Sequence, residues 1–180
     1  MIQAFKTNIP LDFLESLRLA MNYNFISKSD IYNWAMSSMK KNDNFDPILI
    51  DITSGINIDA REIDYAIKRI TEGKLETKNS KRILISYISR ELLQDKITHK
   101  EAAAFLYKLY FDLDFEDSEK SRFYRFDYDI LFNGFNAPEK LDQNYKDLEN
   151  TIAPYLELNF ENYDSWNEIN NKIDLLKASY

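Results

Sequence analysis

The sequence predicts an all-α fold, a single-domain array of antiparallel helix hairpins that spans residues 1–180. The chain holds only 3 Gly and 4 Pro, whereas many-stranded sandwiches and barrels need turns rich in both. Three helix-start signals recur along the chain, and apolar residues follow each of them at helical spacing. No linker rich in Pro, Gly or Ser divides the chain, so we expect one domain.

The three start signals share one pattern, in which an Ile precedes a capping residue and an acidic residue follows the cap three positions later. The caps are Ser27, Asp59 and Thr98. A cap side chain accepts a hydrogen bond from a backbone N–H of the first turn, which satisfies a donor that the helix itself leaves unpaired. The pattern predicts helices at 28–41, 60–72 and 99–112. Its recurrence at Ile26, Ile58 and Ile97 hints at stacked helix pairs.

Apolar periodicity predicts further helices at 11–22, 80–95 and 138–152, and a last one capped by Asp164 or Ser165. Pro138 suits the first turn of a helix. Pro154 is expected to end or kink that helix, because proline lacks the backbone N–H that a helix interior needs. Gly73 is expected to end the helix at 60–72 in a left-handed conformation.

Two segments are less regular. Residues 46–56 are rich in β-branched side chains, which favours a strand, but no second strand is available to pair with it. We therefore expect a short helix after Pro47. The stretch 117–133 is aromatic and acidic, and we expect a short helix followed by irregular chain.

Composition excludes several kinds of site. The absence of Cys excludes disulfides, zinc–thiolate sites, iron–sulfur clusters and Cys nucleophiles. The single histidine, His99, lies in the first turn of a predicted helix, where it would point to solvent without an orienting neighbour. The N-terminus lacks the apolar core of a secretory signal, and no apolar run approaches the length of a membrane span. We expect a cytoplasmic protein with no catalytic activity, no cofactor and no metal site.

Charge is distributed unevenly along the chain, whose formal net charge is −7. Residues 1–90 hold 13 Lys and Arg against 11 Asp and Glu, whereas residues 91–180 hold 10 against 19. Such a surface would repel the phosphates of nucleic acid and suits neither nucleic acid nor membrane. A basic protein is a good partner, because opposite potentials raise the rate of association.

Aromatic and acidic residues alternate within 111–129, where the rings are Phe111, Phe115, Phe123, Tyr124, Phe126 and Tyr128. One interpretation is a buried aromatic cluster beneath a solvated acidic rim. The other is a docking surface, in which rings supply contact area and carboxylates supply complementarity to a basic partner. The candidate partner-binding residues are Asp112, Asp114, Phe115, Glu116, Asp117, Glu119 and Tyr124, with Glu157, Glu161 and Asp164 from a second acidic stretch.

Three segments carry a resemblance to a known group of proteins: IPLDFL at 9–14, FISKSDIYNWAMSSM at 25–39 and LYFDLDF at 109–115. The chain resembles, over about its first two-thirds, the small, acidic, all-helical immunity proteins of bacterial contact-dependent growth inhibition and polymorphic toxin systems. The resemblance implies a cytoplasmic inhibitor that binds one cognate toxin domain and blocks its active site. Such toxins are often nucleases with basic clefts, which an acidic, aromatic patch would suit as a nucleic-acid mimic.

Two other functions remain open. The first is a small enzyme with a carboxylate site, with or without a divalent metal. Such an enzyme should bury two or more carboxylates together and perturb their pKa values. The second is a non-enzymatic adaptor or regulator, which only its partner would distinguish from an inhibitor.

Overall fold

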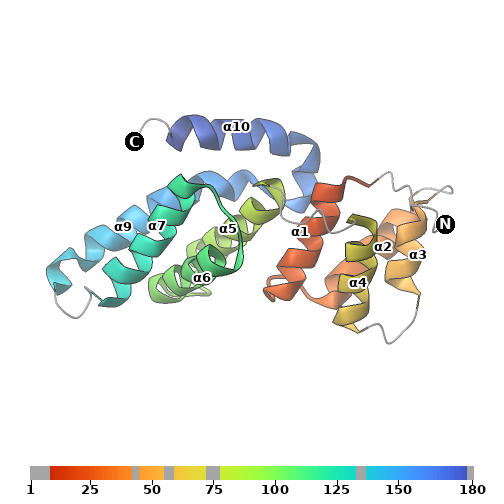
Figure 1. Cartoon of the computed structure of the whole chain (residues 1–180), viewed down its shortest axis with the longest axis horizontal. Helices are drawn as coiled ribbons and strands as arrows, with labels where there is room; N and C mark the ends of the chain where they lie inside the picture. The colour runs from red at the N-terminus through yellow and green to blue at the C-terminus, as the bar shows by residue number, and fades with distance from the viewer. Residues whose placement is uncertain (1–8, 42–44, 55–58, 72–77, 133–136, 178–180) are drawn as a thin grey trace. The chain divides into compact units, whose positions relative to one another are not determined.

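Every element is a helix among the described residues, which are 9–41, 45–54, 59–71, 78–132 and 137–177 of a computed structural model (Figure 1). This confirms the all-α prediction. The chain divides into two units, residues 1–80 and 81–180, and each is described by itself. The expectation of one domain over the whole chain stays a prediction.

The described residues of the first unit form four helices ahead of α5 (Lys78–Leu93), drawn from red to yellow in Figure 1. They are α1 (Leu11–Asn22), α2 (Lys28–Lys40), α3 (Pro47–Thr53) and α4 (Ala60–Thr71). Helix α1 packs against α4, and α3 packs against both α2 and α4. Their buried side chains include Leu14, Leu17, Ile31, Ile48, Ile52, Ile63 and Ile67. These aliphatic residues recur at helical spacing, so each helix has one apolar face.

The second unit contains α5 and α6, the two longest described helices, with further helices and several short turns. Its elements are α5 (Lys78–Leu93, which begins at the end of the first unit), α6 (His99–Asp112), α7 (Asp117–Asp127), the π-helical turn η1 (Tyr128–Phe132), η2 (Pro138–Lys140), α9 (Leu141–Ile152), η3 (Ala153–Glu157), η4 (Phe160–Ser165) and α10 (Trp166–Lys177). Helix α6 packs against α7, and η1 contacts α6, α7 and α9. Their buried side chains include Leu106, Leu109, Phe123, Phe126, Ile130, Leu148, Ile152, Trp166 and Ile173.

The predicted caps lie where the sequence places them. Ser27 and Thr98 each form a capping box, in which the hydroxyl accepts from the N–H three residues later at 3.2 Å. The carboxylates of Asp30 and Glu101 accept from the N–H groups of these caps at 2.7 Å. Asp59 accepts from the N–H of Arg61 at 3.2 Å. Helices α2, α4 and α6 accordingly begin at Lys28, Ala60 and His99.

The links α1–α2 and α5–α6 have the same backbone conformation. Asn24 and Asp95 adopt φ values of 61° and 54°, three residues before the caps of α2 and α6. Asn and Asp occupy this left-handed region more readily than other non-glycine residues, because their short side chains bond locally. The recurrence at Ile26 and Ile97 therefore corresponds to one repeated helix–turn–helix unit. Ile58 lies outside the described residues, as does Gly73 with its expected cap.

The less regular segments resolve into helices. Residues 47–53 form α3, the short helix predicted after Pro47. Asp46 caps this helix and accepts from the N–H of Ile48 at 3.1 Å. Helix α7 continues into the π-helical turn η1 where irregular chain was expected. Phe123, Phe126 and Ile130 are all buried, so the apolar face of α7 extends through this turn. Pro154 ends α9, and the chain continues as the 3-10 turn η3. No helix in the described part of the chain is long and apolar enough to cross a membrane.

The capping box of α6 should contribute measurably to stability. Thr98→Ala removes the side-chain acceptor, and we expect the free energy of unfolding to fall by about 1 kcal/mol. Urea denaturation followed by circular dichroism measures this change. Ser37→Ala, at an exposed position of α2, is the matched control and should change stability by no more than about 0.5 kcal/mol. An equal loss in the two variants would contradict a role for the cap.

Candidate functional site

Four aromatic side chains gather on one face of α6 and α7, and we call them the aromatic cluster. They are Tyr107, Tyr110 and Phe111 of α6 and Tyr124 of α7. Phe111 packs edge-on against Tyr107 and Tyr110, with ring centroids 4.8 Å apart in both pairs. Tyr124 lies 6.0 Å from Tyr107 and 5.8 Å from Tyr110. The rings contact one another, so the cluster presents a continuous aromatic face.

Two of the four rings are exposed, and the other two, Tyr107 and Tyr110, are half-buried. Phe111 is 64% exposed and Tyr124 is 50% exposed. In α6 the positions 107, 110 and 111 share one helix face, because residues three and four apart are neighbours on a helix surface. Leu106 and Leu109 are buried on another face of the same helix. Exposed contiguous apolar area of this kind is typical of an interaction surface.

The acids nearest in sequence are Asp112, Asp114, Glu116 and Asp117, and all are exposed. Bases compensate for several of them, contrary to the impression that the sequence gives. The Nζ of Lys120 lies 2.5 Å from a carboxylate oxygen of Asp114, and the Nζ of Lys81 donates to its backbone oxygen. Glu116 lies 3.8 Å from the guanidinium of Arg82. Lys81 and Arg82 belong to α5, about 30 residues earlier, so linear charge counting could not detect them.

Two of the expected partner-binding residues belong to the interior instead. Phe115 is 3% exposed and packs edge-on against Phe123 at 5.3 Å between centroids. Glu119 is 2% exposed and pairs with Arg82 at 2.9 Å. Neither side chain is available to a docked partner, so both expectations are corrected. Of the six rings in this stretch, Phe115, Phe123 and Phe126 are buried, whereas Phe111, Tyr124 and Tyr128 are exposed.

The second acidic stretch, Glu157, Glu161 and Asp164, is exposed on η3 and η4. The charge of Glu161 acts on Arg90 of α5, and that of Glu157 acts on Lys172 of α10. This stretch is therefore also partly balanced by bases from other helices. The surface of α6 and α7 is the stronger candidate, because it combines acids with exposed rings.

A buried arginine accounts for the position of Glu119. The Arg82 side chain is fully buried, and its Nε donates to Glu119 at 2.9 Å. Its other nitrogens donate to Asn170 at 3.0 Å and to Asp174 at 2.7 Å, both in α10. The hydroxyl of Tyr155 donates to the same Glu119 oxygen at 2.7 Å. We call these five residues the Arg82 network, and it joins α5, α7, η3 and α10.

The network also shifts the pKa values of its members in ways that follow from burial and charge. Burial lowers the pKa of Arg82, but the charge of Glu119 and the hydrogen bond to Asp174 outweigh it, so the net shift is upward. Burial raises the pKa of Tyr155 far above its usual range, and the charge of Glu119 adds to this. Arg82 therefore remains charged and Tyr155 remains protonated, so the pattern of donors and acceptors does not change near neutral pH.

His99 has partners that sequence spacing could not indicate. Its Nε2 lies 2.6 Å from a carboxylate oxygen of Glu149, and its ring stacks on Tyr145 with centroids 4.2 Å apart. Both partners come from α9, more than 40 residues later, whereas the sequence suggested a side chain free in solvent. An imidazole oriented by a carboxylate is the usual base of acid–base catalysis. In the described part of the chain, no hydroxyl group hydrogen-bonds to this ring.

Tyr107 and Tyr110 precede the stretch in which rings and acids alternate, so that pattern did not indicate them. Their i, i+3 and i+4 spacing with Phe111 would have indicated a second, aromatic face on the predicted helix at 99–112.

No family model, curated protein or solved structure matches the chain.

Removing one member of the Arg82 network should destabilise the protein strongly. Arg82→Met leaves Glu119 buried without its cation, and we expect the free energy of unfolding to fall by about 3–5 kcal/mol. The double variant Arg82→Met with Glu119→Leu should lose less than the sum of the single losses, because no uncompensated charge remains. Chemical denaturation of the four proteins gives the coupling energy. Arg61→Met, at a side chain that is 91% exposed, is the matched control. If the double variant loses the sum of the two single losses, the pairing of Arg82 with Glu119 is contradicted.

Proposed function

We propose that this chain is an inhibitor that binds a basic partner protein through the aromatic cluster and the exposed acids beside it. The resemblance to immunity proteins suggests the partner, a cognate bacterial toxin domain with a basic cleft, such as a nuclease. Under this proposal the chain acts in the cytoplasm and blocks the toxin's active site. The observation that carries it is the exposure of Phe111 and Tyr124 within a cluster of four contacting rings.

The rings and the acids have different roles in the proposed interface. Large aromatic side chains supply much of the binding energy when a partner covers them, because they bury a wide area with little loss of conformational freedom. Phe111 and Tyr124 are therefore the proposed anchors. Asp112 and Asp117 are rim charges, which act on the association rate and on its salt dependence more than on the dissociation rate.

The proposed binding residues differ from those that the sequence suggested. Asp112, Asp114, Glu116, Asp117 and Tyr124 are retained, because each is exposed. Tyr107, Tyr110 and Phe111 replace the buried Phe115 and Glu119 as the remaining contacts. Because Lys120 pairs with Asp114, the negative charge of this surface is smaller than the number of its acids suggests. Under the proposal the rings therefore contribute more of the binding energy than the acids do.

The enzyme alternative has one observation in its favour, the His99–Glu149 pair. A carboxylate enzyme would bring buried acids together, whereas the buried Glu15 and Glu119 each pair with an arginine at 2.6 and 2.9 Å. In the part of the chain that the structure describes, no group of three or more His, Asp or Glu side chains could hold a metal ion. An adaptor or regulator would use the same aromatic cluster, and the identity of its partner would separate it from an inhibitor.

Truncation of the two anchors should abolish protection against the toxin. The test expresses the toxin domain encoded beside this gene, with and without this chain, and measures bacterial growth. Wild type should restore growth, and Phe111→Ala with Tyr124→Ala should not. In a titration of the purified proteins, each truncation should cost about 2 kcal/mol, about thirty-fold in Kd.

Tyr65→Ala is the matched control, because Tyr65 is 67% exposed on α4 of the first unit. It should protect as well as wild type, and thermal melts should show that all variants fold. The proposal is wrong if the neighbouring genes encode no toxin domain, if wild type does not restore growth, or if the double variant protects fully.

A second test separates the inhibitor from the enzyme. His99→Ala removes the imidazole from Glu149 but leaves the aromatic cluster in place, so we expect protection and partner affinity to remain at the wild-type level. The growth assay and the titration described above measure both. Loss of protection in a folded His99→Ala protein that still binds its partner would favour the enzyme.

A further inference from the structure

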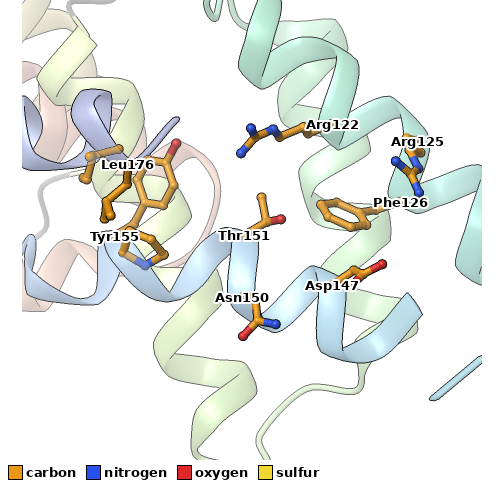
Figure 2. A pocket seen from close by; sticks show the side chains of 10 residues that line it. Arg122, Arg125, Phe126, Asp147, Asn150, Thr151, Tyr155 and Leu176 are labelled. Atoms are coloured by element: carbon orange, nitrogen blue, oxygen red, sulfur yellow. The ribbon is translucent and has the colours of Figure 1, made fainter. Parts of the chain in front are cut away.

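A cleft of about 490 Å³ opens between α7, α9 and α10 of the second unit (Figure 2). Arg122, Arg125 and Phe126 of α7 form one side, and Thr151 of α9 lies opposite. Tyr155 of η3 and Leu176 of α10 close one end. The volume lies within the range of small-molecule sites, which combine apolar walls with a few convergent polar groups.

Two arginines line the cleft although the chain is acidic. Arg122 and Arg125 are three residues apart on α7 and share one helix face, where like charges repel and weaken the helix slightly. Arg125 pairs with Asp129 at 2.8 Å, but its side chain remains 70% exposed. Arg122 forms no hydrogen bond or ion pair with any residue that the structure describes. Arg125 is thus balanced by Asp129, and Arg122 is the lining cation that no acid in the described part of the chain pairs with.

Arg122 is oriented toward the cleft. Figure 2 shows its side chain extending from α7 toward the end of the cleft where Tyr155 and Leu176 lie. Asp147 also lines the cleft and accepts a hydrogen bond from Gln143 of its own helix at 2.8 Å. Asp129 balances Arg125, so the lining charges that form no ion pair with a described residue are one positive group, Arg122, and one negative group, Asp147.

The Arg82 network holds two walls of the cleft in place. The Tyr155 hydroxyl is engaged by Glu119 at 2.7 Å, which fixes the ring at the end of the cleft. Arg82 holds Asp174 at 2.7 Å, and Asp174 lies in the same helix as Leu176. These walls are therefore ordered before a ligand binds, so less conformational entropy of the protein is lost on binding.

We propose that this cleft binds a small organic anion that carries a carboxylate or phosphate group on an aromatic or aliphatic body. The guanidinium of Arg122 presents paired N–H donors that match both oxyanions in a bidentate geometry. Arg125, whose charge Asp129 balances, lies one turn further along α7. Phe126 and Leu176 contact the apolar body, and the Thr151 hydroxyl offers a further hydrogen bond. This site is separate from the aromatic cluster and does not depend on the proposed toxin partner.

The test uses the full chain and four probes: phenyl phosphate, benzoate, the neutral benzamide and inorganic phosphate. A titration followed by ¹H–¹⁵N NMR measures Kd and the amides that respond. We expect phenyl phosphate or benzoate to shift amides of α7 and α9 around Arg122 and Thr151. Benzamide, which lacks the charge, and inorganic phosphate, which lacks the apolar body, should each bind at least about tenfold more weakly. Tighter binding of phenyl phosphate than of benzoate identifies an organophosphate, and the reverse identifies a carboxylate.

Two variants test the assigned contacts. Arg122→Gln removes the unpaired guanidinium without breaking an ion pair, so the protein should fold and bind the better probe at least about tenfold more weakly. Leu176→Glu adds an acid to the cleft at a position that is 49% exposed, and it should weaken binding by a similar factor. Arg61→Gln, on exposed surface of α4, should bind as wild type does. The proposal is overturned if neither aromatic anion shifts these amides up to about 10 mM, if benzamide matches benzoate and phenyl phosphate, or if both cleft variants retain wild-type affinity.

Discussion

One buried cation organises the second unit of this protein. A guanidinium without contact to solvent is costly unless its donors are satisfied and its charge is balanced. Arg82 meets both conditions by drawing Glu119 from α7 and Asn170 and Asp174 from α10, at distances of 2.7 to 3.0 Å. Tyr155 then donates to Glu119 and joins η3 to the same centre. The positions of these elements therefore depend on satisfying one side chain of α5.

The buried Arg82 explains part of the acidic sequence around α7, because some of these acids balance charges within the fold. Glu119 pairs with the buried Arg82, and Glu116 lies 3.8 Å from the same guanidinium. Asp114 pairs with Lys120. Several acids of this stretch are thus balanced by bases within the fold, so fewer of them contribute to the negative potential of its surface. What distinguishes the surface of α6 and α7 is the exposed aromatic cluster, and the acids act around it at the rim.

The 11 residues of helix α7 lie in three different environments. Glu119, Phe123 and Phe126 are buried. Tyr124 joins the aromatic cluster beside α6, and Arg122 and Arg125 face the cleft toward α9. The helical period separates adjacent residues by about 100°, so neighbours in sequence reach chemically different environments. Two proposed sites of opposite charge preference can therefore lie on one short helix without overlapping.

The sequence by itself determined the local structure. Four helix starts could be predicted, three from the caps Ser27, Asp59 and Thr98 and one from Pro47. Capping and proline effects involve residues within one helical turn, so the local sequence is enough to show them. Helix periodicity likewise indicated which faces are apolar. Among the candidate contacts, Tyr124 and the exposed acids could be named from the pattern of rings and carboxylates, and they remain in the proposed surface.

Only the tertiary structure decided which charged groups and aromatic rings are exposed to a binding partner. Glu119 meets Arg82 across 37 positions of sequence, and His99 meets Glu149 across 50. No local pattern encodes such pairs, because they depend on how helices pack and not on neighbouring residues. The same packing buried Phe115 and left Phe111 exposed, although both rings stand among acids in one stretch. Burial is a property of the assembled helices, so the division between core and surface followed from the fold.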